Sequence, residues 1–190
     1  MKATLGRLQP SCVYALLGTT KSRAKRAVSS AVADSYEAVD YGLSIMLLEA
    51  AVDCGSKPRF VYLSAMGADG RPINAYMDVR KRVEAAIRGS ALPHLIARPA
   101  IVSGSDREEQ RLAERTAARV SDGLLSLVAR LGAPGFADRY RSITGVALAA
   151  AMVALATDDP RAAIVAEAGD LRSADTRSTP STPSTPSTPS

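Results

Sequence analysis

Short apolar runs alternate with longer stretches of helical spacing along this chain, and this alternation restricts the fold more than any other feature of the sequence. Three largely apolar runs, each ending at or just before a Gly, Ser or Pro, occupy residues 12–17, 59–64 and 94–98. Two stretches between them repeat apolar residues at helical spacing, residues 35–54 and 74–87. We therefore expect an α/β fold, with a parallel sheet whose strands are joined by right-handed helical crossovers.

The second half of the chain continues the alternation and then changes character. Residues 108–131 and 142–156 have helical patterns, and residues 163–166 can form a small terminal strand. A chain of 190 residues has room for one domain with a single core, which we place at residues 1–172. Residues 173–190 include a repeated Ser-Thr-Pro segment that cannot build a core, and we expect a disordered tail.

Charge and cysteine content narrow the class of protein. The formal net charge of +5 is modest and gives no reason to expect a nucleic acid or a membrane as partner. The apolar runs are too short to cross a bilayer. Cys12 and Cys54 are the two cysteines, and their spacing fits neither a metal site nor a disulfide framework. We expect a cytoplasmic protein with reduced cysteines and no bound metal.

A serine at the end of one predicted strand and a tyrosine at the start of the next helix suggest a carbonyl-reducing site. Ser64 ends the run of residues 59–64, and Tyr76 opens the predicted helix. Arg80 follows Tyr76 by one helical turn, so the two side chains share a face. A tyrosine with a reference pKa of about 10 needs a nearby cation to exchange protons near neutral pH. Arg80 is the cation that this pattern supplies.

Polar loop residues follow each of the predicted strands. Ligands of parallel sheets bind beyond the carboxyl ends of the strands, so three loops are expected to converge on one crevice. The residues that begin these loops are Gly18, Thr19 and Thr20 after the first strand, Ser64 after the second, and Pro99 after the third. A Gly turn followed by hydroxyl residues is also ordinary loop chemistry.

Five segments together resemble the atypical short-chain dehydrogenases, an NAD(P)-binding Rossmann-fold family, in the branch of the Tat-interacting-protein-like oxidoreductases. The resemblance covers the chain from about residue 11 to about residue 172. The matching segments are residues 15–20, 39–41, 63–69, 76–84 and 98–108.

The resemblance implies hydride transfer between NAD or NADP and a small-molecule carbonyl or alcohol. Ser64 would hydrogen-bond the substrate oxygen, and Tyr76 would donate or accept its proton. Arg80 occupies the position at which the family has a lysine that binds the nicotinamide ribose; arginine keeps the charge but not the geometry of an ammonium. The residues that the resemblance places at the cofactor are Gly18, Thr19, Thr20, Arg80 and Pro99.

One part of the family pattern is missing. The opening residues contain no Gly-x-Gly-x-x-Gly turn to hold a cofactor pyrophosphate, and the first predicted strand corresponds to the fourth of the family. An N-terminally truncated fold is therefore expected, with an apolar edge strand that includes Val13 and Leu17. Two alternatives would cover this edge strand. A partner chain or another copy in an oligomer completes the sheet, or the residues before Ser11 pair with the strand. A non-catalytic Rossmann-like binding module is the alternative function.

Overall fold

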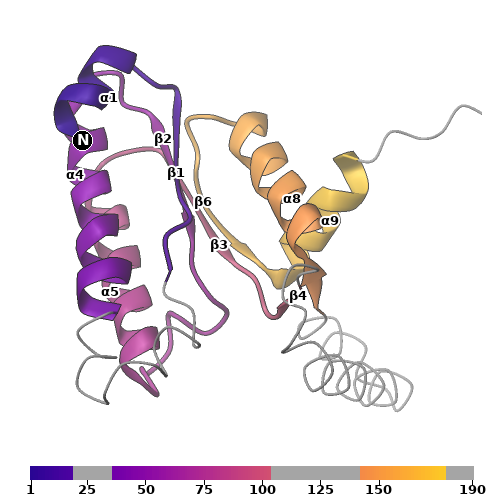
Figure 1. Cartoon of the computed structure of the whole chain (residues 1–190). Helices are drawn as coiled ribbons and strands as arrows, with labels where there is room; N and C mark the ends of the chain where they lie inside the picture. Colours follow the sequence, from indigo (N-terminus) through magenta and orange to yellow (C-terminus); the bar gives the residue numbers. More distant parts are fainter. Residues whose placement is uncertain (19–35, 104–141, 179–190) are drawn as a thin grey trace, which may run out of the picture.

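A computed structural model describes residues 1–18, 36–103 and 142–178, and it is built around a four-stranded parallel sheet with the strand order β1-β2-β3-β6 (Figure 1). The predicted α/β class and its parallel sheet are confirmed. The strands are β1 (Cys12–Ala15), β2 (Arg59–Leu63), β3 (His94–Arg98) and β6 (Ala163–Glu167).

Helices cover both faces of this sheet, which makes the described part of the chain a three-layer structure (Figure 1). One layer contains α1 (Lys2–Leu8), the π-helix η1 (Tyr36–Leu43), α4 (Ser44–Asp53) and α5 (Ala75–Gly89). The other layer contains α8 (Gly145–Asp158) and α9 (Ala168–Ser178). Near α8, β4 (Val102–Ser103) and β5 (Ile143–Thr144) form a short parallel pair.

The two faces of β2 show why this strand lies at the centre of the fold. Phe60 and Tyr62 are fully buried against α4 and α5, whereas Val61 is fully buried on the α8 side. Side chains alternate between the faces of a strand, so a continuous apolar run is what a strand covered on both sides requires. The carboxyl ends of β2 and β3 are thereby held at one edge of the sheet, next to the start of α5.

Side-chain caps mark where two of the helices begin. Asn74 caps α5, because its Oδ1 accepts a hydrogen bond of 2.9 Å from the backbone N–H of Met77. The helix predicted over residues 142–156 begins later than expected. Ile143 and Thr144 are in β5, and Thr144 caps α8 through the N–H of Ala147 at 3.1 Å.

The residues before Ser11 form a helix, so they do not add a strand to the sheet. Helix α1 packs on α4, and Lys2 pairs with Asp53 at 2.7 Å. Gln9, in the left-handed region at φ 46°, ends the helix, and its side-chain amide donates to the carbonyl of Cys54. Within the described strands β1 pairs with β2 alone, so it lies at the predicted edge of the sheet.

Some predicted features fall in segments that the structure does not describe, and one predicted boundary differs from the structure. The helix of residues 108–131, together with Thr19 and Thr20, falls in the segments that the structure does not describe. Helix α9 continues to Ser178, so the predicted domain boundary at residue 172 falls within it. In the described ranges, no helix combines the length and the apolar character needed to cross a membrane.

Candidate active site

The loops after the first three strands meet at one end of the sheet, beyond the carboxyl ends of the strands. The N–H of Ser64 donates to the carbonyl of Ala97 at 2.8 Å, and the N–H of Met66 donates to the carbonyl of Pro99 at 3.0 Å. Gly18 lies close to α5, because a Cβ at this position would be 3.1 Å from Nη2 of Arg80. The structure therefore brings Gly18, Ser64 and Pro99 to the same end of the sheet, as the topology predicts.

Arg80 is a buried cation that joins three elements. Its exposed fraction is 5%, and it pairs with the fully buried Asp40 of η1 at 2.9 Å. Its Nη1 donates to the hydroxyl of Tyr62 and to the carbonyl of Leu63, both at 2.9 Å. Burial raises the pKa of Tyr62 to about 12, against the influence of Arg80, so this phenol stays neutral. These contacts occupy most of the N–H donors of the Arg80 guanidinium and hold elements of the fold together.

Tyr76 lies beside Arg80, which confirms the proximity predicted from their spacing. The guanidinium carbon of Arg80 is 4.9 Å from the centroid of the Tyr76 ring, within the range of a cation–π contact. On another side, the ring of Tyr36 meets Tyr76 edge-on, with 5.7 Å between centroids. Tyr76 is half-buried. The contact with Arg80 and the contact with Tyr36 together fix the position of the ring.

The hydroxyl of Ser64 has a partner that the sequence analysis did not identify. Ser64 is 4% exposed, and its Oγ donates to Oε1 of Glu84 on α5 at 2.6 Å. Glu84 in turn accepts two hydrogen bonds from Arg98, at 3.0 Å from Nε and 2.6 Å from Nη2. A signal for this contact exists in the sequence: Tyr76, Arg80 and Glu84 follow at intervals of four and so share one face of α5.

Arg98 connects this serine to two further loops. Its Nη1 donates to Asp69, in the loop after β2, at 2.9 Å and to Glu167, at the end of β6, at 2.8 Å. Burial alone would raise the pKa of Glu84, but hydrogen bonds from Arg98 and Ser64 outweigh it and hold that pKa below its ordinary value. The carboxylate form of Glu84 is therefore the form that the fold stabilises.

The lowered pKa of Glu84 predicts a loss of stability in acid. A carboxyl group with a lower pKa in the folded state stabilises the fold above its unfolded pKa of about 4.3 and loses this contribution as pH falls through the folded value. We expect the urea midpoint of the native chain to fall steeply below about pH 4.3. Glu84→Gln should be less stable at pH 7 but show a flatter profile below pH 5; parallel profiles would contradict the assignment.

The other predicted residues have more limited roles in what the structure describes. Pro99 is buried, and its carbonyl accepts the hydrogen bond from Met66. Thr19 and Thr20 lie outside the described residues. Within the described ranges, no three His, Cys, Asp or Glu residues lie close enough together to hold a metal ion.

Comparison with known proteins adds no identification. No protein-family model matches the chain, and no curated protein matches it. The structure thus defines a class, an α/β protein with a four-stranded parallel sheet covered by helices on both faces. The chemistry of the site rests on its own residues: a phenol beside a buried cation, and a serine hydroxyl held by a carboxylate.

Proposed function

We propose that this chain is an NAD(P)-dependent oxidoreductase of the short-chain dehydrogenase type, on a Rossmann-like parallel sheet. The observation that supports this most is the 4.9 Å contact between the Arg80 guanidinium and the Tyr76 ring, at the carboxyl end of the sheet. This contact places a fixed positive charge beside the ring of the phenol that would exchange a proton with the substrate. The cofactor would lie over this end of the sheet, near Gly18 and Pro99.

In the proposed reduction, Tyr76, with Arg80 beside its ring, would give its proton to the carbonyl oxygen of a small substrate, and solvent would return the proton. NADH or NADPH, when bound, would supply the hydride for the carbonyl carbon and would leave as NAD⁺ or NADP⁺. Ser64 would hold the same carbonyl oxygen. Because the Ser64 hydroxyl donates to Glu84 at 2.6 Å, it must rotate away from Glu84 to donate to a substrate. Arg98 then keeps Glu84 paired.

A second candidate, a non-catalytic Rossmann-like binding module, is favoured by the same hydrogen bond. Ser64 is 4% exposed and already bonded to Glu84. Arg80 is likewise committed to Asp40, Tyr62 and the carbonyl of Leu63. If these contacts persist when ligand binds, the site can hold a nucleotide but cannot orient a carbonyl group.

Cofactor titration followed by turnover separates the candidates. We expect NADPH or NADH to change its fluorescence saturably on addition of the protein, and the complex to reduce phenanthrenequinone, a reactive dicarbonyl probe. Tyr76→Phe should bind the cofactor with similar affinity but reduce the probe about 100-fold more slowly, since general acid catalysis is lost. Tyr14→Phe, a change at a partly exposed tyrosine of β1, is the matched control.

The outcomes are distinct. Equal rates in Tyr76→Phe and native protein would reject the assigned role of Tyr76. Cofactor binding without turnover in the native chain would leave the binding module. No saturable signal at millimolar NADPH or NADH would reject the oxidoreductase and leave only the non-catalytic module.

A further inference from the structure

Arg59, the first residue of β2, is a buried cation that no described residue contacts as a counter-charge. The residue is 1% exposed. Its Nε, Nη1 and Nη2 atoms are all buried, and none has a hydrogen-bond partner within the described part of the chain. A guanidinium group carries five N–H donors and stays charged in proteins. Leaving such a group desolvated and unpaired costs several kcal/mol.

The other two buried arginines in the described part of the chain both have a carboxylate partner. Arg80 pairs with Asp40 at 2.9 Å, and Arg98 pairs with Glu84 at 2.6 Å. In both cases a buried carboxylate from another element meets the guanidinium. Arg59 has the same burial but lacks this contact. The structure therefore contains a preformed donor group whose acceptor is not among the described side chains.

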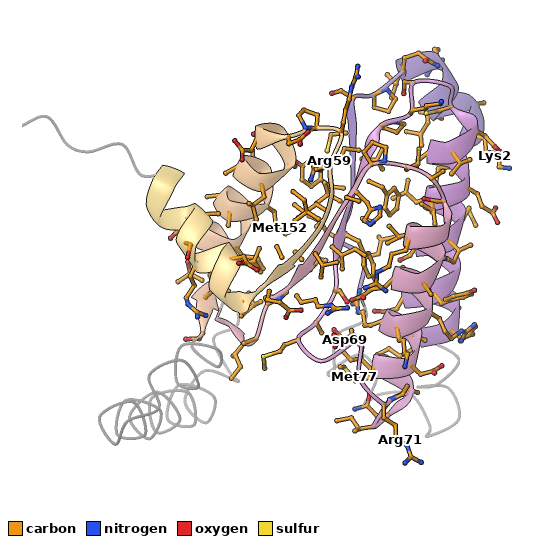
Figure 2. All side chains as sticks on the ribbon, turned by 180° about the vertical axis from the view of Figure 1, so that it is seen from behind. Lys2, Arg59, Asp69, Arg71, Met77 and Met152 are labelled. Carbon is orange, nitrogen blue, oxygen red and sulfur yellow. The ribbon has the colours of Figure 1, made fainter. Side chains whose placement is uncertain are left out.

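Arg59 lies far from the candidate active site. It is at the amino end of β2, on the face of the sheet that α8 covers, because it alternates with Phe60 and shares its face with Val61. Figure 2 shows it beside α8, at the end of the sheet opposite Asp69 and Arg71. Tyr14 of the edge strand β1 faces the same side and is 37% exposed, so solvent reaches the immediate neighbourhood of Arg59.

The nearest internal candidate for a counter-charge is Asp159, which follows α8. Burial lowers the pKa of Arg59, and the charge of Asp159 opposes that effect. However, Oδ1 of Asp159 accepts a hydrogen bond of 3.1 Å from the backbone N–H of Arg161. Asp159 thus acts on Arg59 through space and forms no ion pair with it among the described contacts.

We propose that Arg59 is the centre of an oxyanion-binding site, for a carboxylate or phosphate group, at the amino ends of β1 and β2. The planar fork of arginine matches the two oxygens of such a group and forms two parallel hydrogen bonds with it. The ligand reaches the fork from the side of β1, by displacement of the Tyr14 ring. This site is independent of the proposed oxidoreductase function, because it uses the opposite end of the sheet.

Thermal unfolding of the full chain in different anions tests the proposal. At equal ionic strength, we expect inorganic phosphate or acetate to raise Tm saturably above its value in chloride, by roughly 5 °C at 100 times Kd. A response to phosphate alone identifies a phosphate ligand, and a response to acetate alone identifies a carboxylate. Identical Tm values in phosphate, acetate and chloride would overturn the site and leave buried water as the partner of Arg59.

Substitution of Arg59 gives a second, independent readout. Arg59→Met removes the unpaired charge and keeps an apolar side chain, so its Tm in chloride should equal or exceed that of the native chain, and the anion response should disappear. Arg71→Met, at an exposed arginine in the loop after β2, should retain the full response. A fall of several degrees in chloride, or failure of Arg59→Met to fold, would show an internal partner and overturn the proposal.

Asp159→Asn distinguishes an external anion from an internal carboxylate as the partner of Arg59, because the two cases predict different changes in anion binding and in Tm. If a ligand occupies the site, removal of a nearby negative charge should tighten phosphate or acetate binding by roughly fivefold. If Asp159 is itself the partner of Arg59, the same change should lower Tm in chloride and leave no anion-specific response. The second result contradicts the proposal.

Discussion

Arg98→Leu is expected to lower the free energy of unfolding by about 3–5 kcal/mol, because it leaves a buried carboxylate without its main partner. The side chains of Arg98 and Glu84 are 4% and 1% exposed, and their contact is 2.6 Å. Arg98 also holds Asp69 and Glu167, so its removal frees the loop after β2 and the end of β6 together. Urea denaturation at pH 7, followed by circular dichroism, measures this loss.

A surface ion pair provides the control for Arg98. Arg82 pairs with Glu37 at 2.8 Å, but the two side chains are 41% and 52% exposed. Arg82→Leu should therefore cost less than about 1 kcal/mol. The double variant Glu84→Leu with Arg98→Leu should recover part of the stability, since it leaves no unpaired buried charge. Equal losses for Arg82→Leu and Arg98→Leu would contradict the structural role assigned to Arg98.

Arg80→Met is expected to have an effect of similar size, about 3–5 kcal/mol, because it breaks a buried ion pair. The change removes the guanidinium that pairs with the fully buried Asp40 at 2.9 Å and the donor to the hydroxyl of Tyr62. Arg80→Lys should lose less stability, because an ammonium keeps the positive charge. It should still be less stable than the native chain, because an ammonium cannot donate to Asp40, Tyr62 and the carbonyl of Leu63 in the same fork geometry. Chemical denaturation of both variants measures the difference.

The Arg80 series also tests how far stability and site chemistry are linked. Under the proposed function, Arg80→Lys should keep cofactor-dependent turnover, because an ammonium keeps a positive charge at this position. Arg80→Met should lose both stability and turnover. An Arg80→Met protein as stable as the native chain would show that the buried ion pair with Asp40 contributes little to the fold.

β2 and β3 were predictable because burial on two faces leaves a strong local pattern, and residues 94–98 form β3 with the predicted bounds. The predicted terminal strand of residues 163–166 is β6 with one residue added, although most of its residues are exposed or half-buried. Helix α1 was not predicted, since none of its residues is buried and no apolar periodicity marks it. Its position depends instead on the packing of Leu5 against the core and on contacts of Lys2 and Gln9 with α4 and the residue after it.

The candidate site was predictable only in part. The spacing of Tyr76 and Arg80 predicts their contact, because four residues along a helix is a local relation, and the structure contains it at 4.9 Å. The partner of Ser64 was missed. Glu84 lies 20 residues further along the chain, and only the packing of α5 on the sheet brings the two together.

By itself, the sequence determined the alternation of strands and helices and the face that Tyr76, Arg80 and Glu84 share, since both follow from the period of the backbone. Only the tertiary structure decided which carboxylate meets each buried arginine. Asp40 is 40 residues from Arg80, and Glu84 is 14 residues from Arg98. Such pairs form where elements that are distant in sequence pack against each other. No local sequence pattern specifies that packing. The same packing buried the guanidinium of Arg59 with no hydrogen-bond partner among the described residues.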